Sequence, residues 1–233
     1  MNCVYKIADV VFEVDVKNKY TYRIMKDYIS AETPDFVITV TDDDLLYEEK
    51  VAPKETPDYT YESIAIYRKF ICKLMDDYNG FFFHCSAVCV NNEGYMFTAK
   101  SGTGKSTHRK LWQKVFKDKV TVINDDKPVI RNVDGVYYIY GTPWQGKEGL
   151  GENIKVKAKA LCFLNRSQTN YVTKIDTKNA VKNMLNQVMR TDNKEQMIKL
   201  LSLLDGFLTQ VSSYDLFVNM DDDAAITAYE NIK

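Results

Sequence analysis

The stretch Ala99-Lys100-Ser101-Gly102-Thr103-Gly104-Lys105-Ser106 decides how the rest of the chain is interpreted. It fits the Walker A pattern except at its first position, where alanine stands in place of glycine. The apolar segment from Tyr95 to Ala99 enters this stretch, and an amphipathic segment from about Ser106 to Phe116 leaves it. The sequence therefore predicts a strand, a phosphate-binding loop and a helix, in that order.

Elementary chemistry explains the residue types of this loop. Gly102 and Gly104 permit backbone angles that turn successive N–H groups inward, towards an anion. The following helix adds its positive dipole end, while Lys105 suits the terminal phosphates and the Ser106 hydroxyl suits Mg²⁺. We expect a nucleoside triphosphate such as ATP, or another polyphosphate, to be held by Ser101, Gly102, Thr103, Gly104, Lys105, Ser106 and Thr107.

A pair of acids follows the next apolar segment. Asn124-Asp125-Asp126 comes directly after Val120 to Ile123. It lies about 20 residues beyond the loop, a separation that accommodates one helix and a return strand. Neighbouring residues at a strand end point in different directions, so one acid would face a metal ion and the other the attacking hydroxyl as general base. The alternative is a polar turn that ends the strand.

Hydrophobic periodicity divides the rest of the chain. Helical spacing runs from Asp58 to Tyr78 and ends at Asn79-Gly80. The segment Phe81 to Val90 is predicted to be one buried strand, followed by a hairpin turn at Asn91 to Gly94. Further strands are expected at 136–140, 158–164 and 214–218, and further helices near 178–189, 194–208 and 222–232.

The first 58 residues alternate like strands and turns. We therefore expect a β-rich part, 1–79, that ends in a helix, and a phosphate-binding part, 80–233, in an α/β protein. The acidic run Asp42-Asp43-Asp44 follows the strand-like segment Phe36 to Val40. It is interpreted as a solvated turn, with a metal site as the alternative.

Composition excludes some classes of function. The chain has 233 residues, with 31 basic and 32 acidic side chains and a formal charge of −1. This balance gives no electrostatic case for nucleic acid or for an anionic membrane surface. No stretch approaches the roughly 18 apolar residues of a membrane span, and the N-terminus lacks the apolar run of a secretory signal. We expect a cytoplasmic protein.

The five cysteines have scattered spacing and an odd count, which does not suggest a disulfide framework. Cys85 and Cys89 would share one face of the expected strand. Buried thiols are the interpretation there, with a metal pair as the alternative, because only two histidines are present to complete a metal site.

A resemblance to a known family emerges at this point. The segment Phe83-His84-Cys85-Ser86-Ala87-Val88, the phosphate loop and Asn124-Asp125-Asp126 resemble the catalytic domain of HPr kinase/phosphorylase, whose fold is shared with the phosphoenolpyruvate carboxykinases. The motif from Gly141 to Glu148 and the tail from Asn219 to Tyr229 look more like the short HPr-kinase-like proteins of bacteria. The resemblance covers about 80–230. It implies a P-loop core of mixed sheets with flanking helices, joined here to a β-rich N-terminal part.

The resemblance also implies roles for individual residues. His84 matches an active-site histidine, although its apolar surroundings alone would suggest a core histidine. Asp126 matches the acid that takes the proton from the acceptor, and Asp125 its neighbour near the metal. Lys105 and Ser106 match the phosphate lysine and the Mg²⁺ hydroxyl. Glu148, or Glu152 in another register, corresponds to a second Mg²⁺-linked acid, and Arg190 is placed by separation alone as a phosphate-contacting arginine.

The chain departs from the family in two places. The loop from Gly141 to Gly151 does not reproduce the signature of the bifunctional enzymes, and no segment matches their C-terminal HPr-docking region. HPr itself as the acceptor, and a reverse phosphorylase activity, are therefore left open.

The sequence favours one hypothesis among three. The first is an ATP- and Mg²⁺-dependent kinase that phosphorylates a hydroxyl, such as a serine in a small protein or peptide, free serine or another small molecule. The second is a non-catalytic nucleotide-binding regulatory module. The third is carboxykinase-like chemistry on a small acid, for which no suitable His/Lys and arginine set is found. A homo-oligomer is possible in each case, since relatives often assemble.

Overall fold

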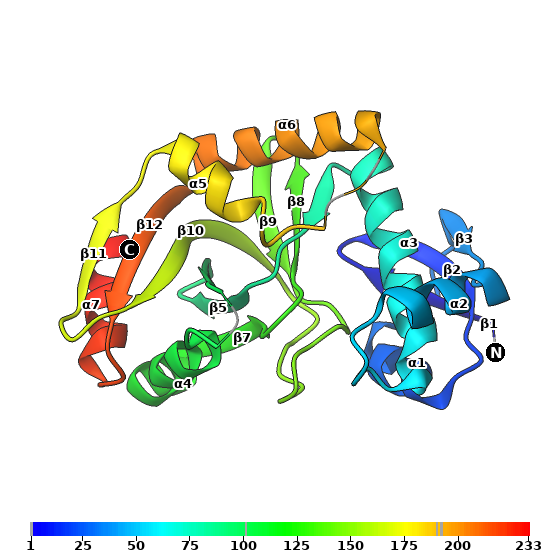
Figure 1. Ribbon diagram of the computed structural model, residues 1–233, viewed down its shortest axis with the longest axis horizontal. Coiled ribbons are helices and arrows are strands. Elements are labelled where there is room, and N and C mark those ends of the chain that lie inside the picture. The colour runs from blue at the N-terminus through cyan, green and yellow to red at the C-terminus, as the bar shows by residue number, and fades with distance from the viewer. Residues whose placement is uncertain (1, 101, 190, 192) are drawn as a thin grey trace. The chain divides into compact units, whose positions relative to one another are not determined.

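The computed structural model describes residues 2–100, 102–189, 191 and 193–233. Within these ranges, no helix combines the length and the apolar character needed to cross a membrane. The chain divides into unit 1, Met1–Tyr78, and unit 2, Asn79–Lys233 (Figure 1). Strands and helices occur in both units, and the expected α/β class, with mixed sheets and flanking helices, is confirmed.

The sheet of unit 1 is built on a tight hairpin. Strands β1 (Asn2–Ile7) and β2 (Val10–Asp15) pair antiparallel, and Ala8 and Asp9 turn the chain with φ of 52° and 59°. Positive φ at both central residues is the geometry of a two-residue hairpin turn. Strand β3 (Phe36–Ile38) pairs with β2 in parallel, so the order β1-β2-β3 leaves β3 at an edge.

Unit 1 also contains helices that correct the expectation of a β-rich part. Helices α1 (Lys19–Met25) and α2 (Asp42–Val51) precede α3 (Tyr61–Asp77), of which only the last is expected from the periodicity. The run Asp42-Asp43-Asp44 is the first turn of α2 and not a free turn.

The caps explain why α2 begins where it does. The Thr41 hydroxyl accepts from the Asp44 backbone N–H at 3.3 Å, and the Asp44 carboxylate accepts from the Thr41 backbone N–H at 2.8 Å. This reciprocal capping box satisfies two backbone donors, and the acidic side chains interact favourably with the helix dipole.

Unit 2 is organised around a nine-stranded mixed sheet. Its main path runs β4-β8-β9-β10-β6-β5-β7, with β12 paired to β10 and β11 paired to β12. The strands are β4 (Gly80–Phe82), β5 (Ser86–Val90), β6 (Glu93–Thr98), β7 (Val120–Asn124), β8 (Val129–Val133), β9 (Val136–Tyr140), β10 (Lys155–Arg166), β11 (Tyr171–Lys174) and β12 (Ser212–Val218).

Strand direction in unit 2 brings distant segments together. Strand β10 is parallel to β6 and to β12, while β5 lies between β6 and β7 and is antiparallel to both. Strands β6, β7, β10 and β12 therefore end, and β5 begins, at the same edge of the sheet. We call this edge the carboxyl edge.

Helices cover both faces of this sheet (Figure 1). Helices α4 (Lys105–Phe116) and α7 (Asp223–Ile232) lie on one face, and α5 (Thr177–Met184) and α6 (Lys194–Gln210) on the other. The core beneath α4 and α7 comprises Val88, Val90, Tyr95, Phe97, Ala99, Leu111, Trp112, Ala160, Cys162, Leu164, Leu216, Ala224, Ala225, Ala228 and Ile232.

One expected strand is interrupted. The segment Phe81 to Val90 forms β4 and β5, with a break at 83–85. In the break, the His84 N–H donates to the Gln187 carbonyl at 2.7 Å, and the Thr98 hydroxyl donates to the His84 carbonyl at 2.9 Å. These partners replace a sheet ladder. His84 consequently lies at the carboxyl edge and not inside a strand.

The capping box at the start of α2 leads to a testable prediction. Thr41→Ala removes the hydroxyl that accepts from Asp44, and such a loss costs about 1 kcal/mol. Hydrogen-exchange mass spectrometry should show amide exchange in residues 42–51 about fivefold faster than in the wild type.

Thr41→Ser is the matched control, because serine retains the capping hydroxyl. Its exchange should stay near the wild-type rate. Equal acceleration in both variants would mean that the hydroxyl does not stabilise the start of α2.

Candidate functional site

The segment between β6 and α4 has the backbone expected of a phosphate loop. Gly102 and Gly104 adopt φ of 77° and 124°, in the region that favours glycine. Gly104 is the N-cap of α4, so the N-terminal N–H groups of that helix lie directly after the loop. Of the residues expected to bind phosphate, Ser101 lies outside the described residues; Ser106 and Thr107 are exposed on the first turn of α4.

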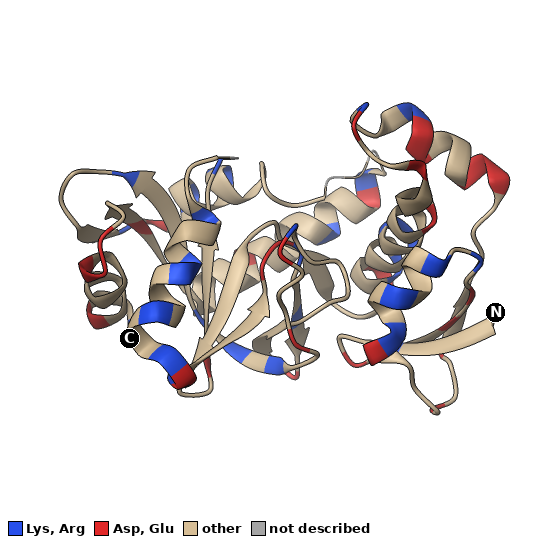
Figure 2. Cartoon of the chain, turned by 90° about the horizontal axis from the view of Figure 1, so that it is seen from below, with Lys and Arg blue, Asp and Glu red and all other residues tan. Residues whose placement is uncertain are grey.

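Lys105 is held over this loop. Its ammonium donates to the Ala99 carbonyl at 3.2 Å. Burial lowers the pKa of Lys105, and the negative charge of Asp126 acts in the opposite direction. Basic residues recur along α4, and no acidic residue lies on it (Figure 2).

Arg166, at the end of β10, is a loop contact that the sequence analysis does not identify. Its guanidinium donates to the Thr103 carbonyl at 3.2 Å and to the Gly102 carbonyl at 2.5 Å. The parallel pairing of β10 with β6 brings this arginine to the loop. No local motif marks it; only its place at the end of a strand that is parallel to β6 could have indicated it.

A hollow of about 490 Å³ opens beside the loop. Its volume lies in the range of small-molecule sites, roughly 300–1,000 Å³. The walls come from the loop, the start of α4 and the ends of β10 and β12; they comprise Gly102, Thr103, Gly104, Thr107, His108, Leu164, Asn165, Arg166, Ser167, Val218, Asn219 and Met220. Both apolar and polar side chains therefore line it.

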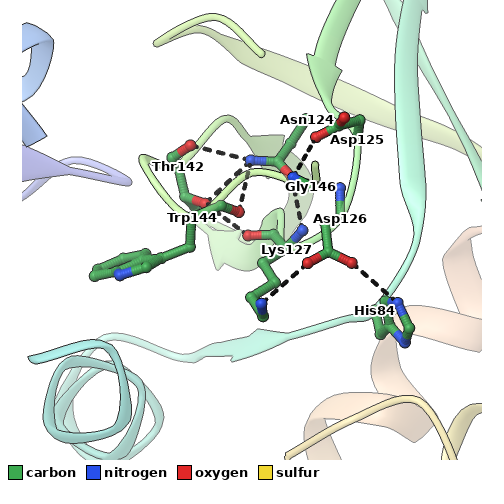
Figure 3. Close-up of polar contacts among 8 residues, drawn as sticks. All are labelled: His84, Asn124, Asp125, Asp126, Lys127, Thr142, Trp144 and Gly146. Atoms are coloured by element: carbon green, nitrogen blue, oxygen red, sulfur yellow. Dashed lines mark hydrogen bonds and ion pairs between the residues drawn. The ribbon is translucent and has the colours of Figure 1, made fainter. Parts of the chain in front are cut away.

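Asn124 connects the segments that carry the acids (Figure 3). Its fully buried amide donates to the Thr142 carbonyl at 3.0 Å and to the Trp144 carbonyl at 3.4 Å. Its carbonyl oxygen accepts from the backbone N–H groups of Asp126 at 2.8 Å and Lys127 at 2.6 Å. One side chain thus fixes both the turn after β7 and the start of the loop that follows β9.

Asp126 has a polar partner on each side, His84 and Lys127 (Figure 3). Its Oδ1 accepts from His84 Nε2 at 3.0 Å, and its Oδ2 lies 3.0 Å from Lys127 Nζ. Burial raises the pKa of Asp126, but the hydrogen bond from His84 and the charge of Lys127 outweigh it and lower the pKa to about 2. Asp126 is therefore ionised at neutral pH, and it orients the His84 ring.

Asp125 faces the loop that follows β9. Its Oδ1 accepts from the Gly146 N–H at 2.7 Å. Burial raises the pKa of Asp125, against the effects of that hydrogen bond and of the Arg109 charge. The two neighbouring acids therefore have opposite pKa shifts and different partners.

Glu148, the expected second metal-linked acid, is bound by basic side chains of α4. Its carboxylate pairs with Arg109 at 2.7 Å and with Lys110 at 2.7 Å. The hydrogen bond from Lys110 and the charge of Arg109 lower the pKa of Glu148. These pairs, and not a contact with Asp125, define its position.

Two polar residues of α4, His108 and Arg109, have surroundings that the sequence analysis does not predict. Both are buried. His108 accepts from Trp112 Nε1 at 2.9 Å, and burial lowers its pKa to about 3, so it stays neutral. Arg109 binds Gln113 and Glu148. Burial of these polar groups depends on partners that the sequence does not specify.

A preformed metal cage is not found. Among the described residues, no group of three or more His, Cys, Asp or Glu side chains is arranged to hold a metal ion. The set of Ser106, Asp125 and Glu148, which includes a hydroxyl and only two such side chains, stays a prediction. Arg190, the expected phosphate-contacting arginine, lies outside the described residues.

A second hollow, of about 310 Å³, adjoins the Asp126–His84 pair. Phe82, Lys127 and residues that follow α5 complete its wall, namely Asn186, Gln187 and Val188. His84 and Asp126 line this hollow, while the charge of Asp126 also reaches Lys105. The acid thus interacts with the loop lysine and also lines the second hollow.

Comparison with known proteins finds a distant structural similarity and no match in sequence. No protein-family model and no curated protein matches the chain. Among solved structures, the Hpr(Ser) kinase/phosphatase from Coxiella burnetii is similar with a TM-score of 0.35 and 8% identity, over 64% of this chain and 95% of that chain. A similarity this distant carries no argument about function.

The ion pairs of Asp126 predict a pH-dependent stability. A carboxyl group whose pKa falls to about 2 on folding stabilises the folded state above its unfolded pKa, and loses that effect as the pH falls through the folded value. Asp126→Asn should therefore lower the free energy of unfolding by about 2 kcal/mol above pH 5, and by progressively less from pH 4 towards pH 2. Urea unfolding at several pH values, followed by tryptophan fluorescence, measures this.

The control is Asp205→Asn, at an exposed position of α6. Its free energy of unfolding should differ little from that of the wild type at every pH. A difference between wild type and Asp126→Asn that stays constant from pH 7 to pH 3 would contradict the ionised pairing of Asp126.

The contacts of Asn124 predict a second effect. Asn124→Ala leaves its buried carbonyl and N–H partners without their hydrogen bonds, which should lower the free energy of unfolding by about 3 kcal/mol. Asn132→Ala removes only a surface turn contact with Gly135 and should cost less than about 1 kcal/mol. Equal losses in the two variants, measured by urea unfolding, would argue against Asn124 as the link between the two segments.

Proposed function

We propose that unit 2 is a kinase that binds ATP and Mg²⁺ and transfers the γ-phosphoryl group to a hydroxyl. One observation carries this proposal. The strand directions of β5, β6 and β7 bring His84, the glycine-rich loop with Lys105, and Asp125-Asp126 to a single edge of the sheet. Open α/β sheets bind their ligands at the carboxyl ends of such strands.

The loop is proposed to hold the phosphates. The positive φ of Gly102 and Gly104 directs backbone N–H groups towards an anion, and α4 adds its positive end. Lys105 would exchange its hydrogen bond to the Ala99 carbonyl for one to a phosphate oxygen, because its ammonium group already lies at the start of the loop. Arg166, which also lines the hollow beside the loop, supports the loop by its bonds to two loop carbonyls.

The hollow of about 490 Å³ is proposed to take the nucleoside. It begins at the loop, so a ligand with phosphates in the loop would extend into it. Leu164 and Val218 offer apolar walls for a base, and Asn165 and Asn219 offer carboxamide groups. This mixture suits a nucleoside, which has an apolar ring face and polar edges.

The residues for the metal are proposed from their chemistry. Mg²⁺ in phosphate sites keeps several waters and takes one or two protein oxygens together with phosphate oxygens. The Ser106 hydroxyl and the Asp125 carboxylate could supply these oxygens, whereas Glu148 would first have to leave Arg109 and Lys110. When bound, Mg²⁺ neutralises charge on the transferred group.

The acceptor hydroxyl is proposed to enter through the second hollow. Asp126 would accept a hydrogen bond from it and orient it, and the proton would pass to the His84–Asp126 pair as the new P–O bond forms and ADP leaves. A carboxylate whose pKa is about 2 is a weak base. In a loose phosphoryl-transfer transition state, positioning and charge neutralisation contribute most.

One observation also fits the alternative, a nucleotide-binding regulatory module. Both Asp126 oxygens already have side-chain partners, His84 and Lys127, as in a purely structural polar network. The alternative predicts nucleotide affinity without turnover, so binding and transfer have to be measured separately.

A transfer assay tests the proposal. Labelled ATP and Mg²⁺ are combined with free serine and a pool of serine-containing peptides, and the products are identified by mass spectrometry. Asp126→Asn and Lys105→Met should each lower transfer by at least about a hundredfold. Asp126→Asn should still bind ATP, whereas Lys105→Met should bind it more weakly.

Lys114→Met is the matched control for Lys105, since Lys114 lies further along α4 and pairs with Asp222 on the surface. It should leave transfer unchanged. Intact transfer in Asp126→Asn would refute the role of this acid. Tight ATP binding with no turnover in the wild type would favour the regulatory module.

A further inference from the structure

Strand β3 in unit 1 has an unpaired side. It pairs with β2 only, and in the described part of unit 1 the sheet ends there. The outer N–H and C=O groups of an edge strand are available to another extended chain. The Val37 side chain on this strand is 63% exposed.

A hollow of about 390 Å³ runs along the same strand. Phe36, Val37, Ile38 and Thr39 line it from β3 and its end, and Lys69 and Lys73 line it from α3. The two lysines are four residues apart, so they lie on one face of the helix. An edge strand, a hollow beside it and a cationic wall therefore occur together.

The two lysines differ in how firmly they are held. Lys69 donates to the Thr39 carbonyl at 2.8 Å and pairs with Asp44, a mostly buried side chain, at 2.6 Å. Lys73 forms an ion pair with Asp77, whose side chain is exposed, and such surface pairs contribute little to stability. Its ammonium lies 5.5 Å from the centre of the Phe36 ring. Lys73 can therefore exchange Asp77 for a carboxylate of a ligand.

We propose that unit 1 binds an extended peptide segment with acidic side chains, which adds to β3 as a further strand. Main-chain hydrogen bonds to the free side of β3 would supply affinity, as in other cases of strand addition. Side chains of a strand alternate between two faces. One set would therefore enter the hollow, where a carboxylate meets Lys73.

A fluorescein-labelled, capped peptide of ten residues, in which glutamate alternates with valine, is the probe. Fluorescence anisotropy with the full chain, without nucleotide, should show saturable binding. A matched peptide of alternating lysine and valine should bind at least about tenfold more weakly, because its charge opposes that of the lysine wall. Lys73→Glu should weaken binding of the glutamate peptide by at least about tenfold.

Two N-methylated peptides test the strand geometry. Strand addition uses every second N–H of the added chain. Methylation of the valine nitrogens or of the glutamate nitrogens should therefore abolish binding in one case and preserve it in the other. Equal binding of both would overturn the proposed pairing with β3.

Two controls separate this site from the rest of the chain. Lys50→Glu, an equal charge change on exposed α2 outside the hollow, should leave binding unchanged. Asp126→Asn should also leave it unchanged, because the peptide site does not depend on phosphoryl transfer. The absence of saturable binding, an unchanged affinity in Lys73→Glu, or a dimer in sedimentation that buries β3 against a second copy would overturn the proposal.

Discussion

Alternation of strand direction across β6, β5 and β7 is the constraint on which the candidate site depends. Strand β5 runs against both neighbours, so the segment that precedes it meets the segments that follow β6 and β7. A break, a loop and an acidic turn, far apart in sequence, therefore lie at one edge. A parallel β5 would place its end, and not His84, at that edge.

Ion pairs link most of the charged side chains of the candidate site. Asp126 lies between His84 and the cationic Lys127, Glu148 binds Arg109 and Lys110, and the charge of Asp126 acts on the pKa of Lys105. Buried charges are costly unless they are paired. An entering polyphosphate would therefore exchange partners with existing ion pairs and would not simply fill a positive pocket. Such exchange couples the position of the loop that follows β9 to the occupancy of the phosphate loop.

The parts of the fold that follow from local chemistry are predictable from the sequence. The helical period of α3, the Asn91-Asn92 hairpin turn and the glycine pattern before α4 each depend on a few adjacent residues, and each is found. The same holds for the acids at the end of β7, which continue directly from their strand.

What depends on distant partners is not predictable in this way. Phe81 to Val90 is apolar, and its interruption depends on the Gln187 carbonyl and the Thr98 hydroxyl. Arg109 is basic, yet it is buried because Gln113 and Glu148 bind it. The acidic start of α2 resembles a turn because helix caps and turns use the same residue types.

Arg166 has a consequence for the cost of ligand binding. Glycine-rich segments lose more conformational entropy than others when they become ordered. The guanidinium of Arg166 bonds to the carbonyls of Gly102 and Thr103 in the protein as it stands. Part of that ordering is therefore completed during folding, because two carbonyl groups of the loop already have a hydrogen-bond partner. An arginine on a neighbouring strand thus holds the glycine-rich residues of the site in place before any ligand binds.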